Sequence, residues 1–147
     1  MTESMGSAPV RILIIEDNRG DVLLVREALR EVDIPFELTH IADGEQAFEH
    51  IERIGSGAQP DIIVLDLNIP KRDGWEILEH IRQTSGLELT PVVIMSSSGN
   101  PEDRERAERT PNAMYIHKPS GLDEFLAIGK QIDDFRLGVH RSTAKTS

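Results

Sequence analysis

The segment Asp61–Glu76 reads DIIVLDLNIPKRDGWE. Its apolar run Ile62–Leu65 has the length and composition of a buried strand, and Asp66 stands where that strand should end. Asp73, followed three residues later by Glu76, has the spacing of a capping box that opens a helix. The segment therefore predicts a strand, a loop and a helix, with a carboxylate at the carboxyl end of the strand.

The same strand-and-helix unit repeats along the chain. Strand-like runs also occur at residues 10–15, 35–41, 91–95 and 113–117, and Asn18 and Asn100-Pro101 mark helix starts. Five such units predict a single doubly wound α/β domain with a parallel sheet. Continuous apolar runs suit inner strands, whereas the alternating run Pro35–Ile41 suits an edge. The order 2-1-3-4-5 satisfies this pattern and places the switch point between strands one and three.

The chain of 147 residues has the size of one domain. We expect a disordered lead-in at residues 1–9, a folded domain at 10–137 and a polar C-terminal tail at 138–147, with the last helix ending near Arg136. Cysteine is absent, which excludes disulfides and fits a reducing, cytoplasmic setting. No apolar run is long enough to span a membrane. The net charge of −10 argues against direct binding to nucleic acid.

Polar residues follow four of the predicted strands: Glu16-Asp17, Asp66, Ser96 and Lys118. Because the carboxyl ends of parallel strands share one edge of the sheet, we expect these side chains to meet there. Crowded carboxylates repel one another unless a cation lies among them. Mg²⁺ is the hard cation suited to carboxylate oxygens, a carbonyl and waters. Zn²⁺ is disfavoured, because cysteine is missing and the five histidines show no paired ligand spacing.

Lys118 and Ser96 each allow a plainer interpretation. Lys118 should point to the carboxylate edge and pair with Asp66 or a phosphate, but exposed lysines are common. The Lys118-Pro119 bond is a candidate cis peptide. Ser96 directly follows its apolar run, although strand-end serines often cap helices, and Ser97, Ser98 and Asn100 compete for that role.

Glu16-Asp17, Asp66, Ser96 and Lys118-Pro119, taken in order and spacing, resemble the receiver domain of two-component response regulators. The stretch Leu65–Gly74 is especially similar, and the resemblance covers about residues 10–137. It implies a flavodoxin-like receiver fold. It also implies that the protein signals and catalyses only its own phosphorylation and dephosphorylation, with no organic cofactor.

The resemblance also implies roles for the acidic residues and the lysine. Asp66 would accept a phosphoryl group from the histidine of a sensor histidine kinase. Asp17, Asp66 and the backbone carbonyl of Asn68 would ligate Mg²⁺, and Glu16 would hold a water of that ion. Lys118 would bridge Asp66 and the phosphoryl group.

Further positions match those that the family uses for switching. Ser96 would donate its hydroxyl to a phosphoryl oxygen, and Tyr115 would be the aromatic residue that turns inward when Ser96 moves. Asn68 and Ser98 occupy positions that tune the lifetime of the phosphoryl group. The family more often has threonine at position 96; serine keeps the hydroxyl but lacks the methyl group, which implies a weaker packing link to Tyr115. The helix from Asn100 to about Arg109 has one clear apolar residue and suits a mobile element, or is simply a solvated helix.

Output would pass through protein contacts, either as a switch, as a phosphorelay intermediate or as a phosphate sink. The last helix carries two apolar stripes, and we expect one to form a homodimer face; the alternative is a single wide stripe facing the core. The Asn68–Gly74 stretch and the polar tail resemble small receivers paired with phytochrome-type kinases. The predicted dimer face comprises Ile128, Ile132, Phe135 and Val139.

Two other classes of protein fit less well. A flavodoxin-like electron carrier needs a phosphate-binding loop after strand one, but this chain has the acidic pair Glu16-Asp17 there. A Mg²⁺-dependent aspartyl phosphatase needs two carboxylates two residues apart after strand one, and Arg19 takes the second place.

Overall fold

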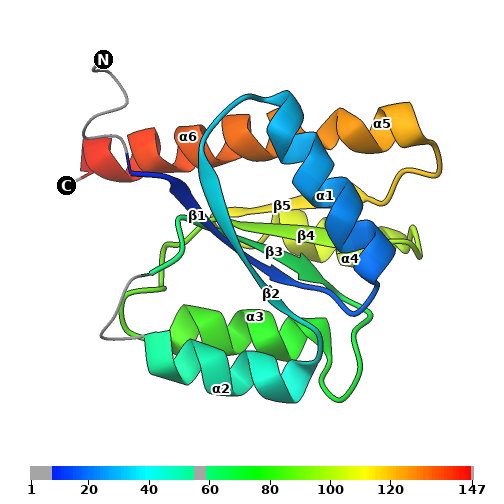
Figure 1. Cartoon of the computed structure of the whole chain (residues 1–147). Coiled ribbons are helices and arrows are strands. Elements are labelled where there is room, and N and C mark those ends of the chain that lie inside the picture. The colour runs from blue at the N-terminus through cyan, green and yellow to red at the C-terminus, as the bar shows by residue number, and fades with distance from the viewer. Residues whose placement is uncertain (1–7, 55–58, 147) are drawn as a thin grey trace.

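A five-stranded parallel sheet lies at the centre of the fold in the order β2-β1-β3-β4-β5 (Figure 1). The computed structural model describes residues 8–54 and 59–146. The predicted strand order is confirmed, with β2 and β5 at the edges. The lead-in predicted at residues 1–9 lies almost wholly outside the described residues. The strands are β1 (Val10–Ile15), β2 (Phe36–Ile41), β3 (Ile62–Asp66), β4 (Val92–Ser96) and β5 (Ala113–His117).

Helices cover both faces of the sheet (Figure 1). On one face lie α2 (Gly44–Ile54) and α3 (Gly74–Gln83), and on the other lie α1 (Arg19–Glu31), α5 (Leu122–Leu126) and α6 (Ile128–Thr146). The short helix α4 (Pro101–Glu108) joins the first face through Ala107, which packs in the same core cluster as α2 and α3.

Side-chain caps fix where three helices begin. Asn18 caps α1 by accepting from the backbone N–H of Asp21. The predicted capping box of Asp73 and Glu76 is present at the start of α3. Asn100 caps α4, with Pro101 in its first turn. These caps end the loops that follow the carboxyl ends of β1, β3 and β4.

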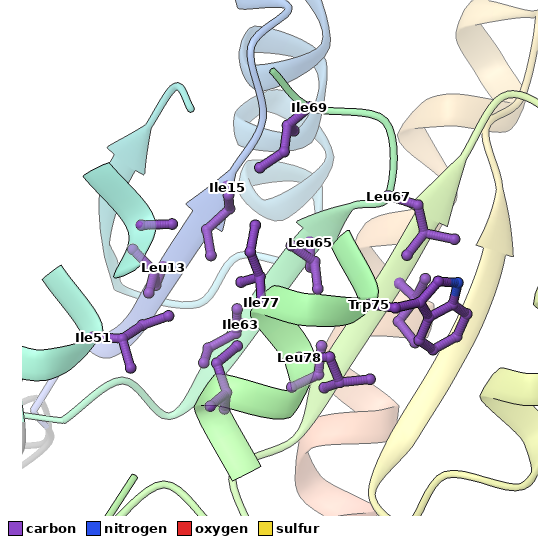
Figure 2. Packing of buried hydrophobic residues seen from close by; sticks show 14 of the residues in the cluster. Leu13, Ile15, Ile51, Ile63, Leu65, Leu67, Ile69, Trp75, Ile77 and Leu78 are labelled. Carbon is purple, nitrogen blue, oxygen red and sulfur yellow. The ribbon is translucent and has the colours of Figure 1, made fainter. Parts of the chain in front are cut away.

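The inner strands are buried on both faces, which explains their continuous apolar runs. In β1, Leu13 and Ile15 pack with α2 and α3 in one core cluster, whereas Ile12 and Ile14 pack in the other. Figure 2 shows Leu13 and Ile15 beside side chains of β3 and α3 in the first cluster. Alternate residues of each strand therefore anchor opposite helical layers, and the strand ends are held rigidly.

The C-terminal helix differs from the prediction in extent. The helical segment is divided at Ala127 into α5 and α6, and α6 continues to Thr146 instead of ending near Arg136. Within the described part of residues 138–147, the expected polar tail is thus helical. No proline follows Pro119, and Gly138 alone is too weak a breaker to end the helix.

The predicted dimer face is wrong for this fold. Ile128 and Ile132 are almost fully buried in the second core cluster, and Phe135 packs against it. Val139 is also buried. The other stripe comprises Leu122, Leu126 and Gly129. Gly129 lies so close to α1 that a Cβ there would be 2.0 Å from the carbonyl oxygen of Ala28. The stripe that contains Ile128 and Ile132 therefore faces the protein's own interior, and Gly129 packs on α1, whereas Leu122 is 60% exposed.

None of the helices in the described ranges combines the length and the apolar character that crossing a membrane requires.

Candidate functional site

Three carboxylates converge where β1 and β3 end. Glu16 and Asp17 follow β1, and Asp66 is the last residue of β3. These strands are neighbours, with Ile15 opposite Leu65. One carboxylate oxygen from each of the three residues lies within 4.8 Å of the others. Glu16 and Asp66 are each only 4% exposed, while Asp17 is exposed. The structure therefore brings these residues together, with one carboxylate open to solvent.

The ammonium group of Lys118 lies among these carboxylates. Its Nζ is 2.9 Å from Glu16 Oε1 and 3.2 Å from Asp66 Oδ2. The backbone N–H of Lys118 donates to the carbonyl oxygen of Ser96 at 2.8 Å, which extends the pairing of β5 with β4. The lysine is thus held at the strand edge by its backbone and its side chain.

The Lys118-Pro119 peptide bond is trans, because no cis peptide bond occurs among the described residues. The predicted cis bond is therefore wrong. The trans form of an X-Pro bond is favoured by about 0.5–1 kcal/mol in the absence of other constraints. The backbone hydrogen bond of Lys118 to Ser96 is made with this trans bond in place.

Burial and charge oppose each other in this cluster. Burial raises the pKa of Glu16 to about 7; Lys118 acts against this rise and Asp66 adds to it. Burial lowers the pKa of Lys118, but the carboxylates of Asp21 and Glu16 outweigh that effect, so its pKa is held above the ordinary value. At neutral pH the cluster is rich in negative charge with a single ammonium group, which favours the binding of a further cation.

In metal-free protein, we expect the free energy of unfolding to fall as the pH rises from about 4.5 to about 7. Folded Glu16 holds its proton more tightly than unfolded Glu16 does. This contribution is complete below the unfolded pKa and is lost as the pH rises through the folded pKa. A shift from 4.5 to about 7 corresponds to about 3 kcal/mol.

Urea unfolding in the presence of a chelator, at about pH 5 and about pH 8, measures this dependence. Trp75, the single tryptophan, provides the fluorescence signal. Glu16→Gln cannot ionise, so its unfolding free energy should vary less between these pH values. An equal variation in the variant and the wild type would contradict the assignment of the effect to Glu16.

The hydroxyl of Ser96 is buried behind the carboxylates. Ser96 ends β4 and is fully buried. Its Oγ accepts from the backbone N–H of Ser98 at 3.1 Å and from the Asn68 side-chain amide at 3.4 Å, and it lies 3.0 Å from the Ser98 hydroxyl. The backbone N–H of Asn68 donates to Asp66 Oδ1 at 3.0 Å. Asn68 therefore links Asp66 to the end of β4, and Ser98 lies beside the same hydroxyl.

An open pocket of about 550 Å³ covers the carboxylates and the lysine. Its walls come from the loops that follow β1, β3, β4 and β5, so a ligand there would contact four segments at once. Ser96 is not part of its lining, since its side chain is turned inward. The residues that line the pocket are Glu16, Asp17, Asn18, Asp21, Asp66, Asn68, Ser97, His117, Lys118, Pro119, Ser120 and Phe125.

The sequence interpretation missed two residues at this site. Asp21, in the first turn of α1, lies 2.8 Å from Lys118 Nζ. Its place in the first turn of the helix that directly follows Glu16-Asp17 could have indicated this. His40, near the end of β2, contacts the carbonyl oxygen of Glu16 through Nε2 at 2.6 Å. No pattern in the sequence signals that contact.

Tyr115 and α4 lie beside the site. The Tyr115 ring is partly buried, with the Arg104 guanidinium 4.9 Å from its centroid. Its hydroxyl is buried without a hydrogen-bond partner among the described residues. The indole N–H of Trp75 donates to Asp103 of α4 at 3.0 Å, and Arg106 lies over its ring at 4.3 Å. Ala107 is the one buried residue of α4, and the side-chain contacts of this helix with Trp75 and Tyr115 add to this attachment.

Comparison with known proteins gives a consistent result. The family model of the response regulator receiver domain matches residues 12–129. The response regulator Rcp1 of Synechocystis sp. is 33% identical over 132 residues, covering 88% of this chain and 90% of Rcp1. The Mn²⁺-bound structure of Rcp1 gives a TM-score of 0.75, with 34% identity, over 86% of this chain and 94% of that structure.

Two further solved structures are similar. The phosphorylated cyanobacterial phytochrome response regulator RcpA is 36% identical, with a TM-score of 0.77, over 88% of this chain and 95% of RcpA. The receiver domain of the sensor histidine kinase PA1611 from Pseudomonas aeruginosa PAO1, with a magnesium ion coordinated in its active-site cleft, is 27% identical. Its TM-score is 0.65, over 85% of this chain and 98% of that domain.

Proposed function

The chain belongs to the response regulator receiver domain family, and from this premise we propose that Asp66 accepts a phosphoryl group from a sensor histidine kinase. One observation carries the proposal. The buried carboxylate of Asp66 lies with two other carboxylates within 4.8 Å, and the ammonium of Lys118 is 3.2 Å from it. A nucleophilic oxygen, a set of oxygen ligands for a cation and a fixed positive charge are the parts that phosphoryl transfer to a carboxylate requires.

In the proposed reaction, a phosphoryl group passes from the kinase histidine to Asp66. An oxygen of Asp66 forms a bond to phosphorus while the bond from phosphorus to the donor's imidazole nitrogen breaks. The released imidazole takes its proton from solvent. Lys118 stabilises the negative charge of the transferred group, and Asp66 is held in place by the backbone N–H of Asn68. The only reactions that the chain catalyses are its own phosphorylation and dephosphorylation.

The donor set fits a hard divalent cation, and we propose Mg²⁺. Asp17, Asp66 and the carbonyl oxygen of Asn68 would hold it directly, and Glu16 would do so through a water. All of these donors are oxygens, which suits Mg²⁺, and the chain contains no cysteine that would favour a softer metal. When bound, the ion neutralises charge on the carboxylates and on the phosphoryl oxygens.

Ser96 and Tyr115 would carry the response. The Ser96 hydroxyl is occupied by Ser98 and Asn68 and must turn toward the pocket to reach a phosphoryl oxygen. This movement would change the space available to the Tyr115 ring. The neighbouring helix α4, which has a single buried residue, would then shift. Asn68 and Ser98, which contact the Ser96 hydroxyl, would set how long the phosphoryl group lasts.

For partners, we propose a phytochrome-type sensor kinase, because RcpA is described as a phytochrome response regulator. Phosphotransfer from a panel of candidate kinases tests this. Acting as a relay intermediate or a phosphate sink is the alternative to switching. A homodimer through the C-terminal helices also stays a proposal, and its interface would use exposed residues such as Leu122 of α5 and Leu137 of α6. Sedimentation before and after phosphorylation would detect it.

Incubation with acetyl phosphate and Mg²⁺ should add one phosphoryl group to the protein, because the small donor enters the open pocket without a kinase. Intact-mass spectrometry measures the product. A chelator in place of Mg²⁺ should leave the mass unchanged, since the crowded carboxylates then repel the anionic donor. Phosphorylation of equal extent with and without the metal would count against the proposed cation site.

A further inference from the structure

The ammonium group of Lys118 is saturated by carboxylates. A lysine ammonium has three N–H donors. Lys118 Nζ lies 2.8 Å from Asp21, 2.9 Å from Glu16 and 3.2 Å from Asp66. The ammonium donates hydrogen bonds to Asp21 and Asp66 and forms an ion pair with Glu16, so three carboxylates surround it. A phosphoryl oxygen on Asp66 that also contacts this ammonium therefore competes with the carboxylates already around it.

Asp21 is the partner that can be displaced most easily. Its side chain is 22% exposed, whereas those of Glu16 and Asp66 are each 5% exposed. A carboxylate near the surface is hydrated by water when it releases the ammonium. The charge of a buried carboxylate would then have neither water nor a cation as a partner. Asp21 also sits on a fixed backbone, because its N–H donates to the cap residue Asn18 at 3.1 Å.

We propose that Asp21 competes with the phosphoryl group for Lys118 and so lowers the stability of the phosphorylated state. This inference deepens the proposed function and rests on it. In the resting protein, Asp21 shares the ammonium with Asp66. After phosphorylation, it leaves a negative charge beside the phosphoryl oxygens and draws the ammonium away from them. Asp21 does not touch the reacting atoms, so it is a positioning residue that acts through Lys118.

Asp21→Asn tests the proposal with beryllofluoride, a phosphoryl mimic, in the presence of Mg²⁺. The variant keeps the backbone N–H that Asn18 caps, so α1 should begin as before. We expect its affinity for beryllofluoride, measured by ¹⁹F NMR, to rise by about fivefold, the size of one partly exposed charge interaction. Glu31→Gln, which removes one charge from the exposed end of the same helix, is the matched control and should bind as the wild type does.

A double-mutant cycle shows whether the effect runs through the lysine. In a Lys118→Met background, Asp21→Asn should lose most of its gain in affinity. An equal gain in both backgrounds would mean that Asp21 acts only as a general negative charge, and the proposal would fall. An unchanged affinity for Asp21→Asn in the presence of Lys118 would also overturn it.

A second measurement does not depend on phosphorylation or metal. In metal-free protein, the ¹⁵N-resolved ammonium signal of Lys118 should exchange its hydrogens with water faster in Asp21→Asn than in wild type. Equal exchange would show that Asp21 does not hold the lysine. If wild type binds no beryllofluoride, the proposed function fails, while the exchange experiment still decides whether Asp21 and Lys118 interact.

Discussion

Asp66→Asn should abolish stable phosphorylation by acetyl phosphate. The substitution keeps the size and shape of the side chain, so the buried end of β3 should pack as before. An amide lacks the anionic oxygen that attacks phosphorus, and it removes one of the clustered carboxylates. Intact-mass spectrometry should show the added phosphoryl group in wild type and none in the variant.

Asp33→Asn is a suitable control for that experiment. Asp33 is exposed and has a φ of 62°, a conformation that asparagine tolerates as well as aspartate does. The control makes the same chemical change away from the pocket and should be phosphorylated like wild type. If Asp66→Asn gained the phosphoryl group as fully as this control, Asp66 would not be the acceptor.

Lys118→Met should destabilise the metal-free protein strongly at about pH 8. The lysine side chain is 12% exposed and serves three carboxylates, so its loss leaves buried negative charge without a partner. Removal of one member of a buried ion pair costs about 3–5 kcal/mol, and we expect the lower end because Glu16 can take up a proton. The loss should shrink toward about pH 5, where the proton-bound carboxyl no longer needs the lysine.

Urea unfolding followed by Trp75 fluorescence measures this effect, and Lys130→Met is the control. Lys130 is 79% exposed and forms an ion pair with the exposed Asp134, so its replacement should change stability little. Millimolar Mg²⁺ should restore much of the stability of Lys118→Met, because a ligand that binds the folded state stabilises it. If the two lysine variants unfolded alike, the ammonium would not compensate the carboxylates.

The sheet and the outline of the site could be predicted because local pattern decides them. Continuous apolar runs such as Ile62–Leu65 mark strands covered on both faces, and Pro35–Ile41 alternates because β2 lies at an edge. Once the strand order is known, Glu16, Asp66 and Lys118 must end at one edge of the sheet. Their convergence is a consequence of topology, so it needs no knowledge of individual side-chain conformations.

The sequence predictions that were wrong or incomplete concern side-chain contacts between elements that lie far apart in the chain. The stripe of Ile128, Ile132, Phe135 and Val139 was predicted to form a dimer face, but it packs on the protein's own core, and Gly129 lets the helix approach α1 closely. The role of Asp21 depends on where Lys118, 97 residues away, places its ammonium. The contact of His40 with Glu16 requires the rotamer of an edge-strand side chain. Hydrophobic periodicity carries none of this information.

Mapping the phosphorylated residue tests the central claim most directly. The protein is phosphorylated with acetyl phosphate and Mg²⁺, the acyl phosphate is reduced with borohydride, and the peptides are sequenced by mass spectrometry. We predict that the reduced side chain is found at Asp66, in the peptide that contains the end of β3. Reduction at another carboxylate, such as Glu16 or Asp17, with Asp66 unmodified, would contradict the account.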